Sequence, residues 1–95
     1  MSEEKTVTEL LKAWVETVMA DKVMFNAVID NKLAETIGLK ENTLEKTINI
    51  LRNASKELAG QNISTGTITK ILIEKQKGLW KIVVFKNRLP LEQPG

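Results

Sequence analysis

The residue types that most often carry out chemistry in proteins are scarce in this chain. Cysteine, histidine and tyrosine are absent, which removes the thiol nucleophile, the commonest general base and the commonest nitrogen ligand for metals. Ser2, Ser55 and Ser64, like the threonines and lysines, have no neighbour at a spacing that suggests an activating partner. The isolated glycines Gly66 and Gly78 do not form a phosphate-binding loop. We therefore expect no enzyme activity, no metal site and no cofactor.

The basic residues are unevenly distributed along the chain. The formal net charge is +2, yet residues 1–30 carry a net charge of −3 and residues 31–60 a net charge of +1. Residues 61–88 carry a net charge of +5. The charged residues of this last segment are Lys70, Lys75, Lys77, Lys81, Lys86 and Arg88, with Glu74. Clustered positive charge is typical of a protein that binds a polyanion. The alternative is an ordinary solvated surface, because most lysines are exposed in any case.

Length and composition indicate a small globular protein. The chain has 95 residues, of which 42% are hydrophobic and 27% charged, and we expect one domain over residues 1–88 with a loose tail over 89–95. The amino terminus is acidic, and no apolar stretch approaches the roughly 20 residues that cross a bilayer. We therefore expect a cytoplasmic protein without a membrane partner.

Hydrophobic spacing predicts a helix near the amino terminus. Apolar residues recur at three- and four-residue intervals over residues 6–20. Thr6 and Glu9 have the spacing of a capping box, so this helix is expected to start at Thr6. The following apolar stretch, residues 23–29, fits either a short helix or an extended segment, because periodicity does not separate the two.

Two further helices are predicted in the middle of the chain. A short one is expected over residues 32–37, because Asp30 or Asn31 can cap its amino end and Gly38 can end it. A longer helix is expected over residues 41–59.

The carboxyl-terminal third has the pattern of a β-hairpin. After a polar loop over residues 61–67, residues 68–74 and 79–86 are rich in β-branched and aromatic side chains. The four residues 75–78 separate them, with Gly78 available for positive φ. Because the second strand is apolar on both faces, one face can pack on the helices. The other must meet the first helix, the 23–29 segment or a second protomer.

The middle of the chain resembles the helix-turn-helix of bacterial and archaeal DNA-binding proteins. The matching positions are Leu33, Ala34, Ile37, Gly38, Leu39, Leu44 and Ile48. Ala34 is small enough for close helix approach, and Gly38 supplies the turn that must separate the two helices. With the preceding helix and the basic hairpin, residues 6–86 resemble a winged helix-turn-helix domain. The resemblance implies an α+β, mainly helical fold of three to four helices with a C-terminal β-hairpin wing.

The resemblance also implies that the second helix of the motif enters the major groove of double-stranded DNA. The residues expected to contact DNA from this helix are Lys40, Glu41, Asn42, Thr43, Glu45, Lys46, Asn49, Arg52 and Lys56. Those expected from the hairpin are Lys75, Lys77 and Lys81. Alternatively, the helical residues are a solvated face, since Glu41 and Glu45 would repel phosphates, and the lysines protect an exposed hairpin from aggregation.

These observations together predict a sequence-specific double-stranded DNA-binding protein, either a transcriptional regulator or a replication or partition factor of a plasmid or virus. Because one copy would neutralise few phosphates, we expect a homodimer joined through the first helix, with Trp14 or Trp80 as an anchor if they are not simply core residues. The alternative is a protein-interaction or assembly module without nucleic-acid binding. RNA binding is a weaker third possibility, because it needs exposed aromatic side chains.

Overall fold

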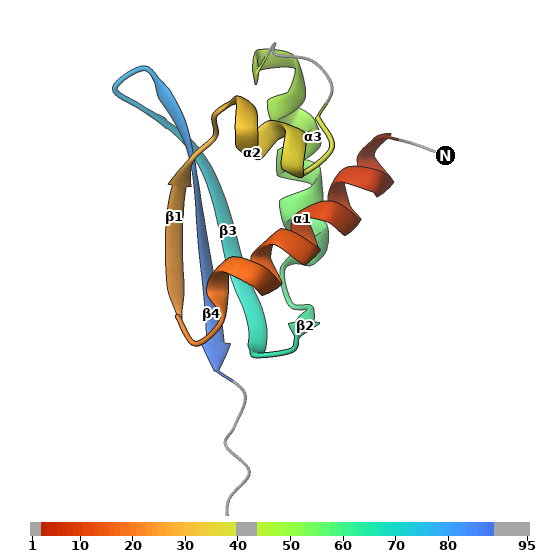
Figure 1. Cartoon of the computed structure of the whole chain (residues 1–95), viewed down its shortest axis with the longest axis vertical. Coiled ribbons are helices and arrows are strands. Elements are labelled where there is room, and N and C mark those ends of the chain that lie inside the picture. The colour runs from red at the N-terminus through yellow and green to blue at the C-terminus, as the bar shows by residue number, and fades with distance from the viewer. Residues whose placement is uncertain (1–2, 40–43, 89–95) are drawn as a thin grey trace, which may run out of the picture.

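Three helices and four strands make up the computed structural model of the chain, which describes residues 3–39 and 44–88. In chain order they are α1 (Glu3–Met19), β1 (Met24–Val28), α2 (Asn31–Thr36), α3 (Leu44–Leu58), β2 (Asn62–Ile63), β3 (Gly66–Gln76) and β4 (Leu79–Arg88). The long β3–β4 hairpin forms the centre of a curled sheet, and the helices lie on one side of it (Figure 1).

The sheet is antiparallel throughout, with the strand order β1-β4-β3-β2. Lys77 and Gly78 form a two-residue turn between β3 and β4, with φ angles of 52° and 81°. Two successive positive φ angles are typical of a type I′ turn, whose twist matches that of the flanking strands. A register irregularity between Ile68 and Lys70 bends β3 close to its start.

The hydrophobic core lies between the helices and one face of the sheet. Val7, Leu11, Val15 and Met19 are fully buried at intervals of four residues, so they form one stripe along α1. The sheet contributes buried residues from its central strands, among them Ile82 on β4. These apolar stripes explain why the helices form, since most of the stability of short helices comes from packing an apolar face.

A buried lysine joins three segments at one end of the sheet. The Lys86 side chain on β4 is only 3% exposed, and its Nζ donates hydrogen bonds to the Ala20 carbonyl oxygen at 2.8 Å. It also donates to the carbonyl oxygen and Oγ1 of Thr65, at 2.8 and 2.6 Å. Burial lowers the pKa of Lys86, Arg88 adds a smaller lowering and Asp21 acts in the opposite direction. This ammonium group therefore links the α1–β1 turn to the β2–β3 turn.

The helical expectations are largely confirmed, with differences at the ends. The first helix begins at Glu3 rather than Thr6, so Thr6 lies inside α1 and does not cap it. Of the two predicted caps of α2, Asp30 and Asn31, the structure has Asp30, whose carboxylate accepts a hydrogen bond from the Leu33 amide at 2.9 Å. Gly38 has a φ of 86°, and α2 and α3 are separate helices, as the predicted turn requires.

The structure contains more β-structure than the predicted hairpin. The ambiguous stretch 23–29 contains a strand, β1, which pairs with β4. The predicted loop 61–67 contains the short strand β2. Both hairpin strands are longer than expected, and two residues rather than four connect them.

The predicted fold class is therefore wrong. We expected a mainly helical winged helix of three to four helices with a C-terminal β-hairpin wing. The structure is an α+β fold of three helices and a curled four-stranded antiparallel sheet, in which strands are a major component. The reason is that β1 and β2, which are too short to identify by local pattern, gain stability from pairing with the long hairpin strands.

Candidate nucleic-acid interface

Part of the predicted DNA-contacting set lies outside the described residues. That part comprises Lys40, Glu41, Asn42 and Thr43. Glu45 and Lys46 fall in the first turn of α3, and their side chains are also outside the described part. Base contacts from the start of α3 therefore remain a prediction from the sequence.

The described part of α3 presents a polar stripe to solvent. Asn49, Arg52 and Lys56 are exposed at positions i, i+3 and i+7, which places them on one face of the helix. The buried stripe of α3, which includes Leu51 and Leu58, packs into the core and fixes the direction of this polar face.

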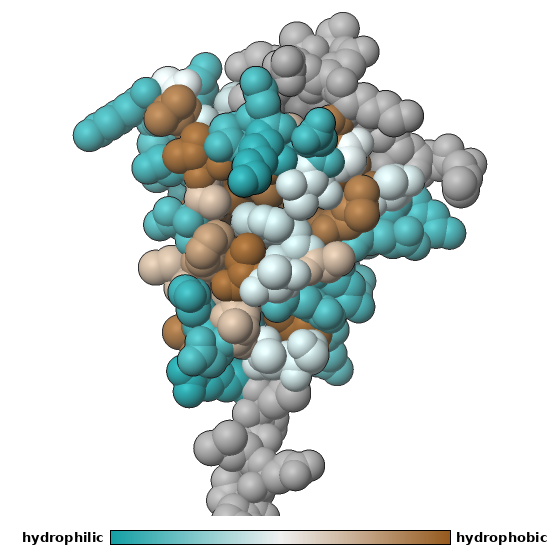
Figure 2. Space-filling model, in the orientation of Figure 1, coloured by the Kyte–Doolittle hydropathy of each residue, from teal (hydrophilic) through white to brown (hydrophobic). Residues whose placement is uncertain are grey.

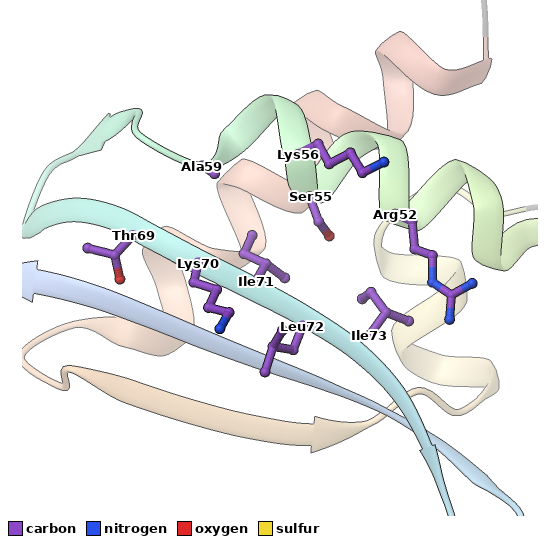
Figure 3. Close-up of a pocket in the computed structure, with 9 residues that line it drawn as sticks. All are labelled: Arg52, Ser55, Lys56, Ala59, Thr69, Lys70, Ile71, Leu72 and Ile73. Carbon is purple, nitrogen blue, oxygen red and sulfur yellow. The ribbon is translucent and has the colours of Figure 1, made fainter.

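A groove runs between α3 and β3, with a volume of about 360 Å³ (Figure 3). Three cationic side chains line it, Arg52 and Lys56 from α3 and Lys70 from β3, and no carboxylate is among the described residues that line it. The Ser55 hydroxyl also lines the groove, but it donates to the Leu51 carbonyl oxygen at 2.8 Å. The groove is therefore a positively charged site over a partly apolar floor.

The edge of β3 that borders this groove has open backbone groups. The Lys86 amide donates to the Val23 carbonyl oxygen, and the Trp80 carbonyl oxygen accepts from the Ile29 amide. The backbone groups of even-numbered β4 residues therefore bond to β1, and those of odd-numbered β4 residues bond to β3. By the alternation of an antiparallel ladder, Ile71 and Ile73 direct their amides away from β4. Within the described residues these two amides have no hydrogen-bond partner.

Cations flank this open edge from both sides. Figure 3 shows Ile71 and Ile73 pointing from β3 toward α3, on the same side as Arg52, whereas Lys70 points to the other side of the strand. An anion at the edge could therefore accept from backbone amides and from cationic side chains on either side.

Trp80 connects α3 to the hairpin. The Arg52 guanidinium carbon lies 5.6 Å from the centroid of the Trp80 ring, and Lys75 Nζ lies 5.8 Å from it. Cation–π contacts at these distances contribute about 0.5–1 kcal/mol each at a partly exposed site. They hold Arg52 and Lys75 close together, so positive charge continues from α3 onto the hairpin.

The hairpin lysines are divided between two places. Lys77 is exposed in the turn, and hydrophilic side chains project from that part of the molecule at the upper left of Figure 2. Lys81 lies directly opposite Glu74 on the sheet face away from the helices, so it is not gathered with Arg52 and Lys56.

Two basic residues of the 61–88 segment make hydrogen bonds within the fold and do not add to the groove. Lys86 is buried, and the Arg88 guanidinium donates to the Asp21 carbonyl oxygen at 2.9 Å. Sequence reasoning counted both in the positive charge available to a partner. It did not include Lys70 among the contact residues, because only the register of β3 shows that Lys70 borders the groove.

The opposite flank of α3 carries charged side chains of both signs. A second groove of about 450 Å³ lies between α1 and α3, where Glu9 and Glu57 accompany Lys5 and Lys12. Two lysines and two glutamates around one groove cancel much of each other's field, so this groove does not favour a polyanion.

No cluster of potential metal ligands occurs in residues 3–39 and 44–88. Within the same ranges, no helix is long and apolar enough to span a bilayer. Comparisons with protein-family models, with curated proteins and with solved structures find no match to this chain.

Proposed function

We propose that this chain binds double-stranded DNA through the α3–β3 groove and the adjoining hairpin. The observation that carries the proposal is the set of Arg52, Lys56 and Lys70 around an open strand edge, without a carboxylate among the described lining residues. Cationic side chains and free amides are the groups that contact the phosphate backbone in protein–DNA complexes. Lys75 and Lys77 extend the same positive surface along the hairpin.

A duplex fits this surface better than a single strand. Proteins that bind single strands stack bases on accessible aromatic rings. Here the Trp14 and Phe25 rings pack edge to face at a centroid distance of 5.8 Å, and Trp80 is engaged by Arg52. These three rings are therefore engaged by other side chains, and the fourth aromatic residue, Phe85, is half-buried on β4 opposite Lys70. Contacts to the regularly spaced phosphates of a duplex are favoured over base stacking.

The proposed binding is non-covalent and marks or occludes a DNA site, as a transcriptional regulator or a replication or partition factor does. Phosphate contacts supply affinity without sequence preference. Sequence preference would come from the predicted base contacts of Asn42, Lys46 and Asn49, of which the Asn49 side chain is exposed on α3.

The proposal is tested by measuring the affinity for a labelled duplex by fluorescence anisotropy over a series of salt concentrations. Each phosphate contact contributes about 0.9 to the negative slope of log K against log salt. The double variant Lys56→Gln/Lys70→Gln should therefore reduce that slope by about 2. The matched control is Lys12→Gln/Lys32→Gln, which removes the same charge from exposed or half-exposed positions elsewhere and should leave the slope nearly unchanged.

Equal slopes for the two double variants would refute the assignment of the groove, and a wild-type affinity independent of salt would refute DNA binding itself. The base contacts have a separate readout. In vitro site selection with Asn42→Ala should yield a less defined sequence than the wild type yields, while the salt slope stays the same.

A second candidate function is a protein-assembly module. Met24, Val28 and Leu79 are exposed, and the register places them on strands whose outer face no described element covers. Exposed apolar residues that lie together favour association with another protein. Sedimentation that shows a stable complex, combined with no salt-dependent binding of DNA, would support this function over the first.

A further inference from the structure

Strand β1 forms an open edge of the sheet opposite to the α3–β3 groove. The hydrogen bonds of Val23 and Ile29 with β4, and the register of Phe25 and Ala27, direct the odd-numbered residues of β1 toward β4. The backbone groups of the even-numbered residues, Met24, Asn26 and Val28, therefore point away from the sheet. Within the described residues, the one backbone hydrogen bond on that side is accepted by the Val28 carbonyl oxygen from the Asp30 amide, at 3.1 Å.

This edge lacks the features that normally prevent strands from associating. Monomeric proteins protect edge strands with charged side chains, prolines or bulges. The β1 sequence, MFNAV, contains no charge and no proline, and its register with β4 is regular. Met24 and Val28 are 47% and 39% exposed. The edge is thus available for pairing with another strand.

The sequence around β1 is complementary to itself in an antiparallel arrangement. When two copies pair around a two-fold axis at Asn26, Met24 lies opposite the partner's Val28, so the outward-pointing backbone groups of one copy face those of the other. The Val28 carbonyl oxygen already accepts from the Asp30 amide in its own chain. In the same register, Lys22 lies opposite the partner's Asp30, and Asp30 opposite the partner's Lys22. Both residues are exposed. Opposite charges at both ends of an uncharged strand favour this register and select a second copy as the occupant.

A groove beside β1, lined by apolar residues together with Asp30, Lys32 and Thr36, adds contact area. It has a volume of about 270 Å³, and Trp14, Val18, Phe25, Ala27 and Leu33 provide its apolar walls. Figure 2 shows hydrophobic side chains close together over β1 and the neighbouring part of α1. Antiparallel pairing around Asn26 places the partner's Phe25 opposite Ala27, at the wall of this groove.

We propose that two copies of the chain pair through β1 and join their four-stranded sheets into one continuous sheet. The interface is isologous and independent of the proposed DNA binding. It lies on the edge opposite to β3 and β2, so both α3–β3 grooves stay accessible in the dimer. A dimer of this kind presents two positively charged grooves related by a two-fold axis.

Sedimentation equilibrium of the full chain, without DNA, tests the proposal first. We expect a monomer–dimer equilibrium, and a chain that remains monomeric up to about 1 mM would overturn the proposal, because even weak specific association is detected at that concentration. Amide hydrogen exchange then locates the interface. The amides of Met24, Asn26 and Val28 should become more protected as the protein concentration rises, whereas those of Phe25 and Ala27 are already bonded within the sheet.

Two substitutions distinguish the β1 interface from any other. Asn26→Pro removes an amide that points away from β4, so the monomer should still fold while the dimer is lost. Asn26→Thr keeps the amide and should dimerise like the wild type. Circular dichroism and tryptophan fluorescence check that both variants are folded. A folded Asn26→Pro variant that still dimerises as tightly as the wild type would refute pairing through β1.

A charge variant at Lys22 tests the register without changing any residue of β1. Lys22→Glu places two carboxylates opposite each other at both ends of the paired strands and should weaken the dimer about tenfold at low salt. The control Lys12→Glu makes the same charge change on α1, away from β1, and should leave the dimer unchanged. Equal dimer affinity for both variants would overturn the register around Asn26.

Discussion

The buried ammonium group of Lys86 should contribute a large share of the stability of this fold. Its Nζ is the single donor that links the carbonyl of Ala20, in the α1–β1 turn, to Thr65, in the β2–β3 turn. Replacing Lys86 with methionine keeps most of the volume of the side chain and removes all three hydrogen bonds. The variant therefore isolates the polar contribution from the packing contribution.

The expected cost follows from the three bonds and from the burial of the charge. A hydrogen bond to a charged group contributes about 1.5–3 kcal/mol, but bonds that share one donor group are not additive. Burying the ammonium group in the folded chain offsets part of the gain. We expect Lys86→Met to lower the free energy of unfolding by about 3 kcal/mol, which for a domain of this size lowers Tm by about 15 °C.

Urea unfolding followed by the fluorescence of Trp14 and Trp80 measures this difference. The control is Lys70→Met, the same change at an exposed position of β3, which should alter the free energy of unfolding by less than about 0.5 kcal/mol. If Lys86→Met were as stable as Lys70→Met, the three hydrogen bonds would contribute nothing to stability and the role assigned to Lys86 would be refuted.

The pH dependence of the unfolding free energy, compared between the wild type and Lys86→Met, gives a second check. Burial lowers the pKa of Lys86 below its ordinary value of 10.5, so between the lowered value and 10.5 the unfolded chain binds more protons than the folded chain. The stability contributed by this residue must then rise with pH over that window. The difference in unfolding free energy between the wild type and Lys86→Met should widen as the pH approaches 10.5, and a difference that narrows would contradict the direction of the shift.

Two local predictions complete the set. A Cβ at Gly66 would lie 2.1 Å from the Asn87 carbonyl oxygen, whereas one at Gly60 meets nothing within 4 Å, so Gly66→Ala should destabilise the chain by about 3 kcal/mol or more and Gly60→Ala by about 1 kcal/mol. Comparable melting temperatures would contradict this reasoning. Asp30→Ala removes the side-chain acceptor of the Leu33 amide and should cost about 1 kcal/mol, while Asp30→Asn should be nearly neutral; chemical denaturation of both variants checks the cap.

Features determined by neighbouring residues could be read from the sequence. The Asp30 cap, the positive φ of Gly38 and the turn at Gly78 each depend on the conformation of a few consecutive residues. The helices also follow from their apolar stripes. The start of α1 is the exception, because the capping-box spacing of Thr6 and Glu9 occurs inside the helix.

Features that depend on distant residues could not be read in the same way. The 23–29 stretch contains the strand β1 because β4, more than fifty residues later in the chain, pairs with it and places Phe85 opposite Met24. Which basic residues share a surface depends on strand register, since an irregularity after Ile68 decides the face on which Lys70 lies.

The sequence by itself determined that cysteine, histidine and tyrosine are absent, that apolar stripes predict helices close to their observed positions, and that positive charge accumulates toward the carboxyl end. These properties follow from composition and from interactions along a few residues of chain. Only the tertiary structure decided that Arg52, Lys56 and Lys70 meet at one groove, that Lys86 is buried, and that β1 is left as an open edge. The physical reason is that hydrogen bonds between strands join residues far apart in the chain, and one change of register moves a side chain to the other face of the sheet.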